Sequence, residues 1–183
     1  MAKLLIFDSN FQGVPGMWRY EIKYLTNLSK TIHLFNLPEF QEAYLANLFE
    51  YIKCGNTEIR QAAACCIARI LEFQYNSAMR NDLVAAIKSD LAESSSCVLR
   101  KTFIFFCKSA VDTFSRAFFK QNFLQAYLVL HKDKVSGVRM EFARSVRKIK
   151  PSLDYDTGLA NELITILTSM HSDCDPDVVE AVQ

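Results

Sequence analysis

The segment Asp133-Lys134-Val135-Ser136-Gly137-Val138-Arg139 ends in an apolar residue followed by an arginine, and this pair recurs along the chain of 183 residues. The other copies are Trp18-Arg19, Ile59-Arg60 and Leu99-Arg100. A fifth copy, Val178-Val179, keeps the apolar residue but lacks the arginine. Self-similarity at a fixed period of about 40 residues indicates an array of helical repeats.

Each recurring arginine is expected near the start of a helix, which we call a B helix. Apolar residues follow the arginines at three and seven positions, the spacing of a buried helical stripe. The residues at three positions are Ile22, Ala63, Phe103 and Phe142, and the later three units add Ile67, Cys107 and Val146. The expected B helices are Trp18–Lys30, Glu58–Phe73, Val98–Phe114 and Gly137–Lys150.

A second set of helices, the A helices, is expected before the loops that lead into the B helices. Apolar pairs at i and i+4 identify them: Tyr44 with Leu48, Leu83 with Ile87, Phe123 with Tyr127, and Leu163 with Leu167. The first members of these pairs also recur at a spacing of about 40 residues. Two independent registers therefore give the same period, and the fold class is predicted to be all-α, with antiparallel helix pairs stacked into an α-solenoid.

Composition supports a helical array. Half of the residues are hydrophobic and 12% are aromatic, whereas only four prolines and five glycines are present, too few for the turns of a β-sandwich. The net charge of +1 is spread along the chain, which argues against a nucleic-acid-binding surface. We find neither a secretory signal nor an apolar run that could span a bilayer, so the six cysteines are expected to be reduced and the protein cytoplasmic, or alternatively nuclear.

The sequence shows no catalytic or metal-binding pattern. Cys-x-x-Cys, Gly-x-Ser-x-Gly, a phosphate-binding glycine loop and His-Glu-x-x-His are all missing. We therefore predict a non-enzymatic protein without metal, cofactor or small-molecule substrate. The aromatic run from Phe103 to Phe123 is interpreted as core, with Phe105 or Phe119 as a possible exposed docking patch. A basic cluster from Arg144 to Lys150 is either a solvated face or a contact for an acidic partner.

The period near 40, the short polar loop and the apolar-arginine pair that opens each B helix resemble the HEAT repeat. Within HEAT proteins the chain is most similar to the group of the protein phosphatase 2A scaffold subunit and protein phosphatase 4 regulatory subunit 4. The segments with this similarity are Arg100–Cys107, Phe118-Phe119-Lys120 and Asp133–Arg139. The resemblance implies a single array over residues 1–183, with units of roughly 1–33, 38–75, 77–114, 116–151 and 154–183. The first and last units are incomplete, as in a piece of a longer solenoid.

In HEAT proteins of this type the recurring arginines pair with loop acids and tie each unit to the next. The corresponding residues here are Arg19, Arg60, Arg100 and Arg139. Acids occur in the later loops, at 133 and from 173 to 177, whereas Asn56 and the Ser94–Ser96 run replace them earlier. We therefore expect weaker pairing between the first units.

The resemblance also implies a function: a non-catalytic scaffold or regulatory subunit for a phosphatase of the type 2A family. In that family the loops from A to B helices engage the catalytic or regulatory subunit. The corresponding positions are Asn56, Glu58, Ser95, Lys132, Asp133, Lys134 and Asp173. A HEAT-array transport receptor, a coat adaptor and a chromosome-organising subunit remain alternatives, as does an accessory region of an enzyme.

Overall fold

The computed structural model describes residues 17–183, and the part of the predicted first unit before residue 17 lies outside this range. The predicted B helices begin and end within one residue of their expected bounds. They are α1 (Trp18–Thr31), α3 (Thr57–Phe73), α5 (Cys97–Thr113) and α8 (Ser136–Ile149), and α10 (Pro176–Val182) is the fifth. Their starts recur at a spacing of about 40 residues, so the sequence period is also the structural period.

The A helices alternate with these. They are α2 (Leu37–Cys54), α4 (Ser77–Ile87), α6 with α7 (Arg116–Phe119 and Gln125–Val129) and α9 (Thr157–Met170). Two of them contain a five-residue π-helical turn, Lys88–Ala92 after α4 and Lys120–Leu124 between α6 and α7. Each wide turn is an irregularity that the apolar periodicity did not predict.

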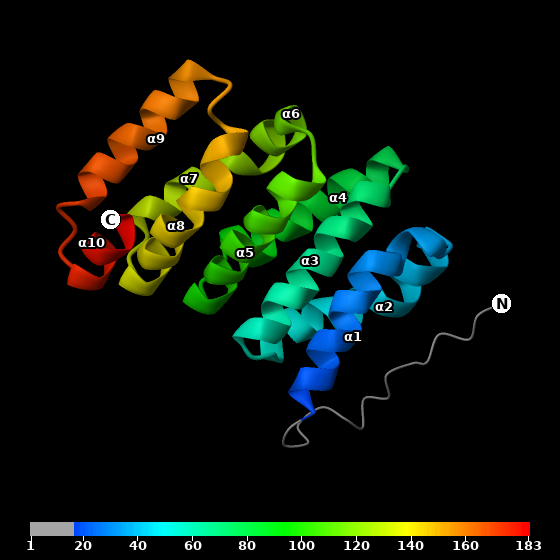
Figure 1. Ribbon diagram of the computed structural model, residues 1–183. Helices are drawn as coiled ribbons and strands as arrows, with labels where there is room; N and C mark the ends of the chain where they lie inside the picture. Colours follow the sequence, from blue (N-terminus) through cyan, green and yellow to red (C-terminus); the bar gives the residue numbers. More distant parts are fainter. Residues whose placement is uncertain (1–16) are drawn as a thin grey trace.

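The chain is all-α throughout the described residues, and its helices are arranged in repeating pairs. Figure 1 shows α1, α3, α5 and α8 side by side in chain order, with α10 beyond α8. α3 packs directly against α1, α2 and α5, and α8 packs against α5 and α10. Each internal B helix therefore contacts the B helices before and after it, and α3 also contacts the A helix of its own unit.

The core follows from this arrangement, because an internal B helix has neighbours on several sides. In α3 the buried set includes Ala63, Ala64, Ile67 and Ile70, whose small and branched side chains allow close approach of both neighbouring B helices. In the terminal helix α10, only Val178 is buried among the described residues. The predicted stripe positions are therefore core positions, most completely so in the middle of the array.

Aromatic packing joins the third unit to the fourth. Phe123 packs against both Phe106 and Phe103, and its ring centroid lies 4.9 and 6.4 Å from theirs. Phe105 and Phe119 are only 8% and 1% exposed. The suggestion that either forms an exposed docking patch is therefore wrong, since both rings are covered by the helices around them.

One glycine is required by close packing at a loop. Gly55 ends α2, and a Cβ atom there would lie 2.5 Å from the Tyr51 carbonyl oxygen and 2.6 Å from Cγ2 of Ile59. Any larger side chain would push the loop away from the first turn of α3. By contrast, a Cβ atom at Gly137 would meet nothing within 4 Å.

Candidate functional site

The four described loops that lead from an A helix into a B helix lie along one edge of the helix row (Figure 1). We call this the loop edge and define it as residues 55–56, 93–96, 133–135 and 171–175, together with the flanking residues Glu58 and Lys132. Buried or bonded polar side chains alternate along it with exposed ones. The bonded side chains join successive units, whereas the exposed ones are accessible to a partner.

Arg100 in α5 connects the third unit to the loop of the fourth. Its Nε and Nη2 atoms donate to the two carboxylate oxygens of Asp133 at 2.5 and 2.8 Å. Its Nη1 atom donates to the carbonyl oxygens of Ser94 and Ser95, at 2.7 and 3.0 Å. The guanidinium is therefore held on its own loop by carbonyl groups and on the next loop by a bidentate carboxylate.

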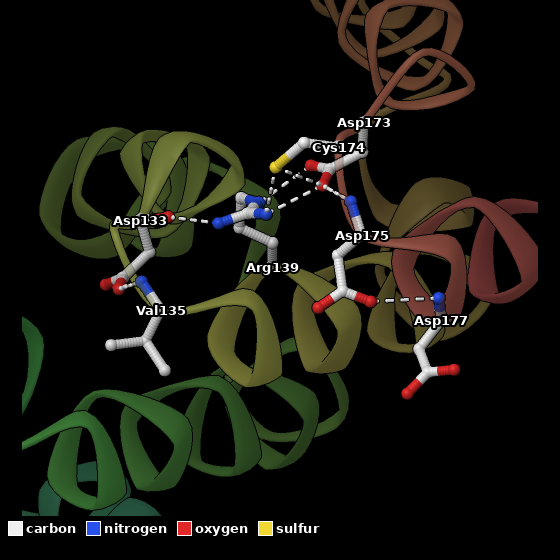
Figure 2. Close-up of polar contacts among 7 residues, drawn as sticks. All are labelled: Asp133, Val135, Arg139, Asp173, Cys174, Asp175 and Asp177. Carbon is white, nitrogen blue, oxygen red and sulfur yellow. Dashed lines mark hydrogen bonds and ion pairs between the residues drawn. The ribbon is translucent and has the colours of Figure 1, made fainter.

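Arg139 in α8 repeats the arrangement one unit later (Figure 2). Its Nε and Nη2 atoms donate to Asp173 at 2.7 and 2.6 Å, and its Nη1 atom donates to the Asp133 carbonyl oxygen at 2.9 Å. The Cys174 thiol lies 3.6 Å from Nη2. We call each arginine with its carboxylate and its upstream carbonyl group a rung, so the described chain has rungs at Arg100 and Arg139.

Each carboxylate of a rung also fixes its own loop. Oδ1 of Asp133 accepts the N–H of Val135 at 2.8 Å, and Oδ1 of Asp173 accepts the N–H of Asp175 at 2.9 Å. The pair side chains are nearly covered, 9% and 5% exposed for Arg100 and Asp133. One acid therefore shapes a loop and joins two units at once.

The rungs shift the pKa of their acids. Burial acts to raise the pKa of Asp133, but the hydrogen bonds from Arg100 and from the Val135 N–H outweigh it, and the pKa is lowered. The hydrogen bond from Arg139 is the main cause that lowers the pKa of Asp173 to about 2. Both acids are therefore ionised at neutral pH, and their charges are matched inside the protein.

Further ion pairs link α5 to α8 away from the loops. Lys108 lies 3.5 Å from Glu141, and Lys148 lies 2.6 Å from Asp112. On the opposite edge, Lys120 pairs with Asp156 at 2.7 Å, and Asp156 also caps α9 by accepting from Gly158 and Leu159.

Arg19 and Arg60 do not form such rungs with the described residues. Arg19 is exposed, and its guanidinium lies 4.5 Å from the centre of the Trp18 ring. Arg60 is half-buried, and its Nε atom is covered without a hydrogen-bond partner in the described part of the chain. The weaker linkage expected for the early units corresponds to these two positions.

Five of the seven predicted partner positions are exposed on the loop edge: Asn56, Glu58, Ser95, Lys132 and Lys134. The side chain of Asn56 is partly used, since it caps α3 by accepting the Ile59 N–H at 2.9 Å. Asp133 and Asp173 lie within the rungs, so their carboxylates already have partners. In the loop of Asp133, the side chains without an ion-pair partner among the described residues are thus the two lysines on either side of it.

The basic cluster divides in a similar way. Lys148 and Lys150 pair with Asp112 and Asp154, whereas Arg144 and Arg147 are exposed. Between residues 17 and 183 the structure contains no group of three or more side chains suited to hold a metal ion. In the same range no helix combines the length and apolar character needed to cross a bilayer.

The carbonyl acceptors of the rungs were missed by sequence reasoning. Both arginines donate to the carbonyl group six residues upstream, Ser94 for Arg100 and Asp133 for Arg139. A backbone acceptor leaves no trace in residue identity. The ion pairs of the rungs, by contrast, have a sequence signature. Each arginine and its aspartate are 33 or 34 residues apart, slightly less than one period.

No family model matches the chain. Two curated proteins are similar to it over 137 residues, which is 74% of the chain. Serine/threonine-protein phosphatase 4 regulatory subunit 4 of Mus musculus is 24% identical, and the protein of the same name from Homo sapiens is 23% identical. The matched region is 16% of each of those proteins, so the chain spans only about a sixth of the length of its relatives. The similarity indicates a distant relationship to a regulatory subunit.

Proposed function

We propose that this chain is part of a HEAT-type α-solenoid that serves as a non-catalytic scaffold or regulatory subunit of a type 2A-family serine/threonine phosphatase in the cytoplasm. The observation that carries the proposal is the similarity, over 74% of the chain, to a regulatory subunit of serine/threonine-protein phosphatase 4. The repeated helix pairs, with their period of about 40 residues, support the solenoid assignment.

The binding surface in this proposal is the loop edge. Its rungs fix the positions of successive loops, so the exposed side chains beside them are held at a constant spacing. Such preorganisation lowers the ordering cost of binding a large partner. Lys132 and Lys134 flank a neutralised acid and have no ion-pair partner among residues 17–183, so this loop would present two positive charges to an acidic surface of the phosphatase.

Direct binding to purified serine/threonine-protein phosphatase 4 catalytic subunit tests the proposal. The chain is immobilised and the catalytic subunit is titrated at low and physiological salt. We expect saturable binding that weakens as salt rises, because lysines at a rim act mainly through long-range attraction. An absence of binding at both salt concentrations, with a chain that melts cooperatively, would contradict the proposed partner.

A pair of charge reversals tests the proposed surface. Lys132→Glu with Lys134→Glu should weaken binding at least tenfold. The matched control is Lys23→Glu with Lys30→Glu, which makes the same charge change on exposed positions of α1, away from the loop edge. Equal loss of binding in the two double variants would show that net charge, and not the loop edge, is responsible.

A further inference from the structure

The junction between the second and third units has the arginine and the loop residue of a rung but lacks the acid. Ser94 stands where Asp133 and Asp173 stand in the later loops. It lies 34 residues after Arg60, the same separation as that between Arg139 and Asp173. It also lies six residues before Arg100, as Asp133 lies six residues before Arg139.

The hydrogen bonds agree with this register. Oγ of Ser94 accepts the N–H of Ser96 at 3.2 Å, which is the bond that the carboxylates of Asp133 and Asp173 form to the residue two positions later. The carbonyl oxygen of Ser94 accepts from Arg100, as that of Asp133 accepts from Arg139. Ser94 therefore has the backbone role of a rung residue but carries a hydroxyl in place of a carboxylate.

The arginine of this junction, Arg60, has one buried N–H group without an acceptor among the described residues. In the later rungs, Nε donates to an aspartate oxygen at 2.5 and 2.7 Å. Nε of Arg60 is covered and has no acceptor among residues 17–183. A covered guanidinium N–H without an acceptor is unfavourable, and a negative charge delivered to it would form charge-assisted hydrogen bonds.

We propose that Ser94 is a phosphorylation site and that its phosphoryl group completes the rung with Arg60. A protein kinase would transfer the γ-phosphoryl group of ATP to Oγ of Ser94. The new O–P bond forms as the bond to the bridging oxygen of ADP breaks, and the hydroxyl proton passes to a base of the kinase. The phosphoserine then has about two negative charges and three acceptor oxygens for the guanidinium.

The surroundings suit this modification. Ser94 is partly exposed in a four-residue loop between two helices, where a kinase gains access without unfolding either helix. Asp90 and Glu93 lie close to Ser94 in sequence, and Glu58 lies close to Arg60; all three are exposed, so solvent screens their repulsion. Ser95, the next residue, is exposed and does not occupy the register of a rung, which makes it a matched control.

The first experiment installs phosphoserine at position 94 by genetic encoding and compares thermal unfolding and amide exchange with the unmodified chain. We expect Tm to rise by about 2–4 °C and exchange at the start of α3 and in residues 93–96 to slow. Both effects should vanish in an Arg60→Gln background. Phosphoserine at Ser95 should produce neither. An equal rise in Tm in the Arg60→Gln chain, or no rise in the parent chain, would overturn the proposal that phosphoserine at position 94 pairs with Arg60.

The second experiment asks whether the modification occurs. The protein is isolated from its own cells in the presence of phosphatase inhibitors, and the peptide that contains residues 93–96 is mapped by mass spectrometry. Phosphate on Ser94 supports the proposal. A peptide recovered only without phosphate, or with phosphate confined to Ser95 or Ser96, contradicts it.

Discussion

Replacement of Arg100 by alanine is expected to weaken the junction between the third and fourth units by about 3 kcal/mol. Loss of one partner of a buried ion pair costs about 3–5 kcal/mol, because the other charge stays buried. The lower figure applies here, since Asp133 keeps its hydrogen bond from the Val135 N–H. The change also frees the carbonyl oxygens of Ser94 and Ser95, which accept from Arg100 at 2.7 and 3.0 Å.

Local opening is the proper measurement, because in a repeat array each unit is stabilised mainly by its neighbours and global unfolding need not be two-state. Hydrogen exchange followed by mass spectrometry should show opening of the first turns of α5 and α8 enhanced by about a hundredfold, the factor that corresponds to about 3 kcal/mol. Exchange in α1 should change little.

Arg60→Ala is the matched control, since it removes the same side chain from the same position of a B helix that has no acid partner among the described residues. Its effect should be on the order of 1 kcal/mol or less. Equal enhancement of exchange around Arg60→Ala and Arg100→Ala would refute the idea that the carboxylate, and not the arginine stem, holds the junction.

Three further results are expected. The pKa of Asp173 is lowered from 3.8 to about 2 in the folded chain, so its pair with Arg139 stabilises the fold fully above about pH 4 and is lost as the pH falls toward 2. The fall of Tm with decreasing pH should therefore be shallower in Asp173→Asn. An unchanged slope would contradict the assignment. Gly55→Ala should destabilise by about 1–3 kcal/mol through its two close contacts, whereas Gly137→Ala, with open space, should be neutral or stabilising in urea unfolding. Phe123→Ala should cost about 3–5 kcal/mol, since its ring is fully buried in the aromatic cluster; a loss below about 1 kcal/mol would show that the cluster repacks.

The B helices could be predicted closely from the sequence because each has a polar loop before it and apolar residues at helical spacing within it. Asn56, for example, lies in such a loop and caps α3 by accepting the Ile59 N–H. The π-helical turns at Lys88–Ala92 and Lys120–Leu124 could not be predicted, since one extra residue in a turn leaves the apolar pattern almost unchanged.

The polar contacts could be predicted only in part from the sequence. The arginine period and the late loop acids indicated which charges could pair, but Asp133 and Asp173 were also expected to face a partner. Their place within the rungs depends on how far one loop lies from the next helix, which is a property of packing. The carbonyl acceptors of Arg100 and the covered Nε of Arg60 likewise arise from backbone positions that residue types do not encode.

The rungs also determine how the array can flex. Arg100 links neighbouring loops across α5–α8 and Arg139 links them across α8–α10, whereas the α1–α3 and α3–α5 junctions have helix packing without a rung among the described residues. Elastic strain that opens this edge is therefore expected to concentrate at the α1–α3 and α3–α5 junctions. A partner that binds both ends of the array would therefore bend the protein between α1 and α5, and the stiffer part from α5 onward would move as a rigid body.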